Sequence, residues 1–112
     1  MDLIRNLAAP ATKEKEVVKT ATFVAPQFHV ILLDDDNHTY DYVIEMLVEV
    51  FGHSQETAYR MACEVDASGF VVVDTTHRDR AELKCEQIKS YGKDWRIGNC
   101  PGSMSAIVEV ET

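Results

Sequence analysis

The clearest structural signal in the chain lies in residues 27–51, which read QFHVILLDDDNHTYDYVIEMLVEVF. Residues 27–33 follow a proline and are rich in branched apolar side chains, which predicts a β-strand. The polar run 34–38 ends the strand, because carboxylate and amide side chains bond to nearby backbone N–H groups and favour turns. Thr39 is a suitable N-cap, and apolar residues then recur at three- and four-residue steps, which predicts an amphipathic helix that ends at Gly52. The expected apolar face consists of Tyr40, Val43, Ile44, Leu47, Val50 and Phe51.

The rest of the chain continues with two helices and two strands. The order strand, helix, helix, strand, helix, strand predicts an α+β fold, a small sandwich with three helices on one side of a three-stranded sheet. The expected elements are a helix from Ser54 to Gly69, a strand over 70–75, a helix from about 77 to 91 capped by Thr76, and a strand over 104–111. The side chains expected to face the core from these elements are Ala58, Met61, Ala62, Val65, Ala81, Leu83, Cys85, Ile88, Ala106, Val108 and Val110.

Two regions fall outside these elements. Residues 1–26 contain Pro10 and Pro26, which interrupt regular structure, and a charged run over 13–19, so we expect a flexible N-terminal extension. Residues 27–112 are then expected to form one folded domain. The loop at 94–102, which contains Gly98 and Pro101, has no role that the sequence assigns.

Composition narrows the class of partner. The chain has 112 residues, 11 basic and 19 acidic, and a formal charge of −8, so its surface repels phosphate backbones and favours cationic ligands or basic protein surfaces. The apolar runs are too short to span a membrane, and we expect no membrane or nucleic-acid partner. Cys63, Cys85 and Cys100 lack the spacing of a disulfide framework or a zinc site, which favours the reducing cytoplasm. The four histidines show no metal-ligand spacing, and we expect most of them at the surface, with no metal or cofactor bound.

Several segments, taken together and in order, resemble the ClpS family of adaptors for the AAA+ Clp protease. The resemblance covers roughly residues 28–110. It is carried by His29-Val-Ile-Leu-Leu-Asp-Asp-Asp36, Asp41-Tyr-Val-Ile-Glu-Met-Leu47, residues 58–65, Gly69, Ala81-Glu-Leu-Lys84 and Met104-Ser-Ala-Ile-Val-Glu109. It implies the ClpS fold, with an antiparallel sheet. It also implies an adaptor that catalyses nothing: it binds proteins whose first residue is bulky and apolar, and it hands them to the Clp unfoldase.

The resemblance also implies which residues form the binding site. The first residue of a substrate offers a free ammonium and an apolar side chain, so the site needs acceptors for the first and an apolar pocket for the second. The positions that match the family's acceptors are Asp34, Asp35 and Asp66, and those that match its side-chain pocket are His38, Tyr40, Val43, Ala62, Val65 and Met104. Lys84 matches a position that docks on the N-terminal domain of the unfoldase, and residues 1–26 match the family's N-terminal extension.

Four of these positions depart from the family pattern. Asp34 stands where Asn is usual and Asp66 where His is usual, so the site carries extra negative charge, and a crowded carboxylate can hold a proton in the empty site. Ala62 replaces a larger apolar residue and should deepen the pocket, whereas Tyr40 replaces Met and fills part of that room. We therefore expect amines to bind more tightly at neutral than at mildly acidic pH, and aromatic first residues to bind more tightly than leucine.

Other interpretations of the acidic turn remain. Asp34, Asp36 and Glu45 fall at three ligand positions of a calcium-binding loop, but Thr39 occupies the position that needs glycine, and a strand precedes the turn. An enzyme would need a nucleophile with a base, and no local signature supports such a pair. The main alternative is a divergent ClpS-like protein that docks on a Clp unfoldase and regulates it without recognising N-terminal residues.

Overall fold

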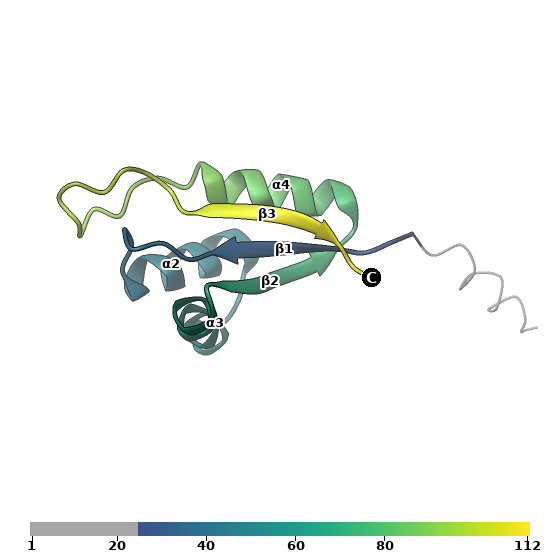
Figure 1. The fold of residues 1–112 in the computed structure, drawn as a ribbon, viewed down its shortest axis with the longest axis horizontal. Coiled ribbons are helices and arrows are strands. Elements are labelled where there is room, and N and C mark those ends of the chain that lie inside the picture. Colours follow the sequence, from purple (N-terminus) through teal and green to yellow (C-terminus); the bar gives the residue numbers. More distant parts are fainter. Residues whose placement is uncertain (1–24) are drawn as a thin grey trace, which may run out of the picture.

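The computed structural model describes residues 25–112, which form three strands and three helices (Figure 1). The elements are β1 (Phe28–Leu33), α2 (Tyr40–Phe51), α3 (Gln55–Ser68), β2 (Phe70–Thr76), α4 (Arg78–Lys89) and β3 (Ser105–Val110). The predicted α+β class and the order βααβαβ are confirmed. The extension expected over residues 1–26 lies outside the described residues, except for Ala25 and Pro26.

The sheet has β1 in its centre, with β2 and β3 antiparallel on either side of it. In this register Leu33, at the end of β1, lies opposite Phe70 at the start of β2 and opposite Ser105 at the start of β3. One end of the sheet therefore gathers three segments that are distant in sequence: the turn after β1, the end of α3, and the residues just before β3. This meeting point positions the site described below.

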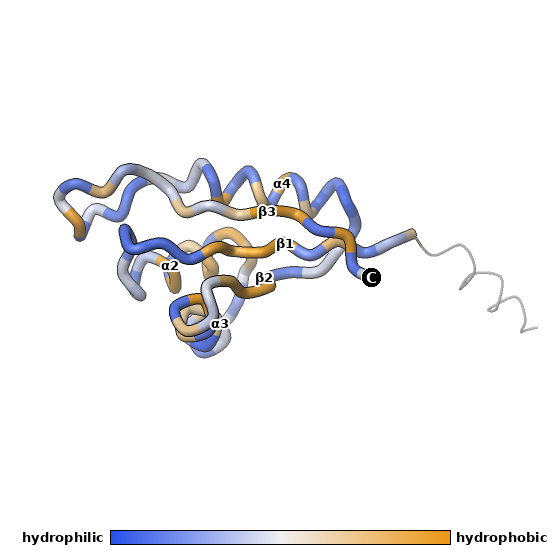
Figure 2. Tube along the Cα trace, in the orientation of Figure 1, coloured by the Kyte–Doolittle hydropathy of each residue, from blue (hydrophilic) through white to orange (hydrophobic). Residues whose placement is uncertain are grey.

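The core lies between the sheet and the helices. Strand residues alternate between the two faces of a sheet, and Val30 and Leu32 of β1 are fully buried against the helices. The helices contribute Met46, Leu47 and Ile88, which are also fully buried. Figure 2 shows hydrophobic colouring along much of β1 and β3, on the first part of β2, and on parts of α2 and α3.

The helix termini follow the expected chemistry in α2 and α3. The Thr39 hydroxyl accepts a hydrogen bond from the backbone N–H of Tyr42, and Ser54 does the same for Thr57. Gly52 and Gly69 end these helices with φ of +74° and +89°, a left-handed conformation that glycine adopts without strain.

The expected start and end of α4 were wrong. The N-cap is His77, whose Nδ1 accepts from the N–H of Arg80, whereas Thr76 belongs to β2. The helix ends at Lys89 rather than Tyr91, because Ser90 forms the C-cap.

Some side chains face differently from the periodicity-based prediction. In α2 it is Tyr42 that is buried, with 3% of its surface exposed, while Tyr40 is 40% exposed and leans toward α3. In α4, Leu83 is exposed because it lies two residues, about 200° around the helix, from buried Ala81. Val110, the last residue of β3, is also exposed.

Within residues 25–112, no helix combines the length and the apolar character that a membrane crossing requires.

Candidate functional site

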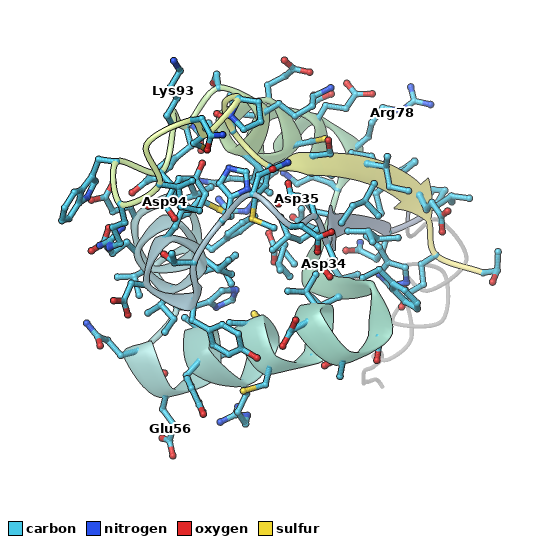
Figure 3. All side chains as sticks on the ribbon, turned by 60° about the vertical axis from the view of Figure 1, so that its left-hand side comes forward. Asp34, Asp35, Glu56, Arg78, Lys93 and Asp94 are labelled. Carbon is cyan, nitrogen blue, oxygen red and sulfur yellow. The ribbon has the colours of Figure 1, made fainter. Side chains whose placement is uncertain are left out.

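The site begins where β1 ends. The N–H of Asp34 donates to the carbonyl of Gly69 at 2.9 Å, which fixes the turn after β1 against the C-terminus of α3. The carboxylate of Asp35 accepts from the N–H of Asn37 at 2.9 Å, a local bond that bends the chain back toward α2. Figure 3 shows Asp34 and Asp35 next to each other at this turn, with α3 running below them.

A small pocket opens between this turn, α2, α3 and the residue before β3. The structure brings together around it all nine residues that the sequence analysis assigned to substrate binding. Its lining consists of Asp34, Asp35, His38, Thr39, Tyr40, Val43, Ala62, Val65, Asp66 and Met104. The apolar wall is buried: Val43, Ala62, Val65 and Met104 are each no more than 5% exposed. The volume is about 40 Å³, which is room for about one water molecule.

A larger and more open hollow of about 580 Å³ lies between α4 and β3. Glu82, Glu86 and Lys89 line it beside apolar side chains, so charges of both signs face the same space. The smaller pocket brings three carboxylates beside a buried apolar wall, an arrangement suited to an amphipathic cation.

The carboxylates at the rim repel one another. Asp34 is exposed, and its pKa is raised above the ordinary value by partial desolvation and by the nearby charges of Asp66, Asp35 and Asp36, against the lowering effect of a backbone hydrogen bond from Asp35. A cation placed among these groups would favour the ionised form of Asp34. The rim is therefore arranged to receive positive charge.

Tyr40 lies at the mouth of the pocket, at the first position of α2. Its hydroxyl donates to Oδ2 of Asp66 at 2.7 Å, and this bond raises the pKa of Tyr40 to about 12. Its ring lies 6.3 Å from the ring of Tyr59 on α3. In this conformation Tyr40 joins α2 to α3 across the opening and occupies an oxygen of Asp66.

His38 is a buried histidine, whereas the sequence analysis expected most histidines at the surface. Only 2% of its side chain is exposed. Nδ1 contacts Oδ1 of Asp35 at 2.8 Å, and Nε2 contacts the carbonyl oxygen of Gly102 at 2.6 Å. The ring is buried because the loop before β3 folds over it, a contact between residues 64 positions apart that no local pattern reveals.

Comparison with known proteins identifies the family. The sequence model described as "ATP-dependent Clp protease adaptor protein ClpS" matches residues 24–96. The chain belongs to the ClpS family. A ClpS adapter protein of Aromatoleum aromaticum is 33% identical over 78 residues, which cover 70% of this chain and 76% of that protein. One from a Synechococcus species is 33% identical over 85 residues, which cover 75% of this chain and 93% of that protein.

A solved ClpS structure has the same fold. The structure of Agrobacterium tumefaciens ClpS2 bound to L-phenylalaninamide matches with a TM-score of 0.67 and 28% sequence identity, over 77% of this chain and 98% of that one. The ClpS relatives are named as adaptors of the Clp protease, and this chain is likewise an adaptor and not an enzyme.

Lys84, the residue assigned to unfoldase docking, lies far from the pocket. Its Nζ donates to the carbonyl of Val50 at 2.7 Å and lies 6.0 Å from the ring centre of Phe51. It therefore supplies positive charge at the C-terminal end of α2, whose last turn has no basic residue of its own. The pocket adjoins the N-terminal end of the same helix, about 17 Å away.

Asp94 is a residue of the site region that the sequence analysis left without a role. It is fully buried, and its Oδ2 accepts from both the backbone N–H and the hydroxyl of Thr39, at 2.7 and 2.8 Å. Its Oδ1 accepts from the backbone N–H of Arg96 at 3.1 Å and from Nη1 of the same residue at 3.3 Å. Burial raises the pKa of Asp94, but these hydrogen bonds outweigh it and hold the pKa below the ordinary value. The loop that contains Asp94 thus fixes the start of α2 and, with it, Tyr40.

Proposed function

We propose that this ClpS-family adaptor binds proteins whose first residue is bulky, aromatic above all, and delivers them to a Clp AAA+ unfoldase. The observation that carries the proposal is the pocket itself, in which Asp34, Asp35 and Asp66 stand beside a buried apolar wall. L-phenylalaninamide, the ligand of the ClpS2 neighbour, joins a free amine to an aromatic side chain. The same two groups would meet carboxylates and an apolar wall here.

The carboxylates bind the amine through charge-assisted hydrogen bonds, which are stronger than neutral ones. An α-ammonium has three N–H donors, and the rim offers one carboxylate for each. Binding would also offset the repulsion that raises the pKa of Asp34. The departures from the family pattern at Asp34 and Asp66 therefore preserve an amine site and make it more acidic.

The side chain of the first residue requires a movement of Tyr40. The volume of about 40 Å³ does not admit an aromatic ring, and the exposed ring of Tyr40 spans the opening. When the hydroxyl leaves Asp66, it frees one carboxylate oxygen and the mouth of the pocket together. Ala62 at the base then leaves room for a larger ring, so Phe, Tyr and Trp should bind more tightly than Leu.

Delivery requires a contact with the unfoldase away from the pocket. Lys84 lies at the opposite end of α2, so an unfoldase N-terminal domain bound there would leave the pocket open. Residues 1–26 would act as the extension that engages the unfoldase. The three cysteines are free thiols, which fits work in the reducing cytoplasm.

Peptide binding tests the proposal. A labelled peptide that begins with Phe should bind with a free N-terminus, and acetylation of that N-terminus should weaken binding by at least about 100-fold, because it removes the charge that the carboxylates require. A peptide that begins with Leu serves as the control for side-chain selectivity. A peptide that begins with Gly, which has no side chain to enter the pocket, serves as the control for the apolar contact.

The second candidate is a regulator that docks on the unfoldase without recognising N-terminal residues. The bond between Tyr40 and Asp66 favours it, because this bond closes the pocket and uses an acceptor. Equal affinity for the free and the acetylated peptide, or binding of neither, together with binding to the unfoldase, would support the regulator and reject the adaptor for N-terminal residues.

A further inference from the structure

The imidazole ring of His38 is held from both sides. Nδ1 lies 2.8 Å from Oδ1 of Asp35, Nε2 lies 2.6 Å from the carbonyl oxygen of Gly102, and the ring packs at 4.5 Å against that of Tyr42. With 2% of the side chain exposed, water has little access to either nitrogen.

The two partners dictate what the ring must donate. A backbone carbonyl oxygen only accepts hydrogen bonds, and a carboxylate also accepts. A neutral imidazole carries one N–H, so it would point a lone pair at one of these oxygens. Both contacts are satisfied when the ring donates from Nδ1 and from Nε2 and bears a positive charge. The titratable groups that face the ring are then Asp35, the thiol of Cys100 at 3.5 Å from Nε2, and the hydroxyl-bearing ring of Tyr42.

The bond to His38 fixes the orientation of the Asp35 carboxylate. Oδ1 of Asp35 accepts from the His38 ring and from the N–H of Asn37. Among the hydrogen bonds of the described residues, Oδ2 of Asp35 has no donor, and this carboxylate lines the pocket. One oxygen is therefore anchored, and the other is available to a ligand.

The opposite side of the ring is anchored by the loop before β3. The Cys100 thiol donates to the carbonyl of Gly102 at 3.3 Å, and the N–H of Asp94 donates to the sulfur of Cys100 at 3.3 Å. Gly102 and Cys100 lie beyond residues 24–96, the range that the ClpS family model matches. The contact thus joins a segment outside that range to a carboxylate of the pocket rim.

We propose that His38 is a positioning residue of the amine site. It donates to Asp35 from Nδ1 and to Gly102 from Nε2, and so couples the loop 92–103 to the carboxylate that receives the ammonium of the substrate. This inference rests on the proposed function. It adds a role for a residue that was expected to line the side-chain pocket, and a role for the loop.

Nitrogen-15 NMR of the histidine side chains in the free, full-length protein tests the hydrogen bonds without a ligand. Both ring nitrogens of His38 should show the chemical shifts of nitrogens that donate hydrogen bonds, and Asp35→Asn should change the Nδ1 signal more than the Nε2 signal. A single N–H donor in His38, or a ring whose signals do not respond to Asp35→Asn, would overturn the inference.

Two substitutions separate positioning from simple packing. His38→Asn places an N–H₂ group where Nδ1 was and keeps the bond to Asp35, whereas His38→Gln places it where Nε2 was and keeps only the bond to Gly102. We expect His38→Gln to weaken binding of a free-amine Phe peptide about 10-fold and His38→Asn to weaken it less than about 3-fold. Thermal unfolding should show similar stability for the two variants.

The outcomes distinguish the two proposals. The proposed function stands if the wild type binds the peptide. If both variants then bind as tightly as the wild type, or if both lose affinity equally, His38 does not position Asp35. If the wild type fails to bind the peptide, the proposed function fails, and the NMR signals still decide whether the ring donates from both nitrogens.

Discussion

Two groups of carboxylates lie close together in this protein and differ in almost every physical respect. Asp94 is fully buried and accepts hydrogen bonds on both oxygens, and its pKa is lowered. Asp34 is exposed beside Asp66 and Asp35, and its pKa is raised. Asp34 and Asp35 belong to the short turn that leads into α2, and Asp94 bonds to Thr39 at the end of that turn.

The difference shows how one chain uses the same functional group for stability and for binding. The donors of Asp94 come from inside the protein, so its ionised form stabilises the fold. Within residues 25–112, the carboxylates at the pocket rim have more acceptor oxygens than hydrogen-bond donors, and a cation placed among them would relieve their repulsion. A carboxylate whose hydrogen-bond donors all come from the protein stabilises the fold. A carboxylate at a pocket that has acceptor oxygens without donors can bind a ligand.

The same substitution at both positions tests this contrast most strongly. Asp94→Asn should lower the free energy of unfolding by about 2–3 kcal/mol, because it removes charge-assisted bonds to Thr39 and Arg96 in a buried site. Asp34→Asn should change it by less than about 0.5 kcal/mol, as expected for an exposed residue. Urea unfolding measures both, and equal losses would contradict the division between the two groups.

Binding should show the reverse pattern. Asp35→Asn should weaken a free-amine Phe peptide about 10- to 100-fold, because a charged acceptor in contact with the ammonium is lost. Asp36→Asn is the matched control: it removes the same charge from the same turn, but Asp36 does not line the pocket, and its effect should stay within about 3-fold. Fluorescence anisotropy gives both affinities, and similar losses in the two variants would show that only the overall charge matters.

The raised pKa of Asp34 predicts how binding depends on pH. The ammonium favours ionised Asp34, so affinity should rise as the pH passes upward through this raised pKa and fall as the pH drops below it. We expect a change of about 3- to 10-fold between pH 7 and the acidic limit of the titration. Asp34→Asn should remove the pH dependence of peptide affinity that the Asp34 carboxyl causes. If the affinity of this variant depends on pH as that of the wild type does, another group causes the dependence.

The smallest expected effect concerns the bond that closes the pocket. Tyr40→Phe keeps the ring and removes the hydroxyl that occupies Asp66, so affinity for the Phe peptide should improve by about 2- to 5-fold. Tyr59→Phe, on the neighbouring exposed ring of α3, provides the control and should leave affinity unchanged. Weaker binding of Tyr40→Phe would indicate that the hydroxyl contacts the ligand and does not compete with it.

Sequence reasoning found the elements from local signals, and it found the residues around the pocket from the resemblance to a known family. Thr39, Ser54, Gly52 and Gly69 mark helix ends within a few residues of the bonds they make. The pocket residues followed from positions that match the ClpS family. The prediction failed where α2 begins, since apolar periodicity placed Tyr40 on the buried face, and the structure buries Tyr42 instead.

The sequence by itself determined the order of strands and helices, the acidic turn after β1 and the apolar side chains available to the pocket, because propensity, capping and periodicity act over a few residues. Only the tertiary structure decided that Asp94 would bond to Thr39 across 55 residues and that Gly102 would cover His38 across 64. These contacts depend on the register of the sheet and on the path of the loop before β3. No window of the sequence contains both partners, so burial and hydrogen bonding at such distances appear only once the chain has folded.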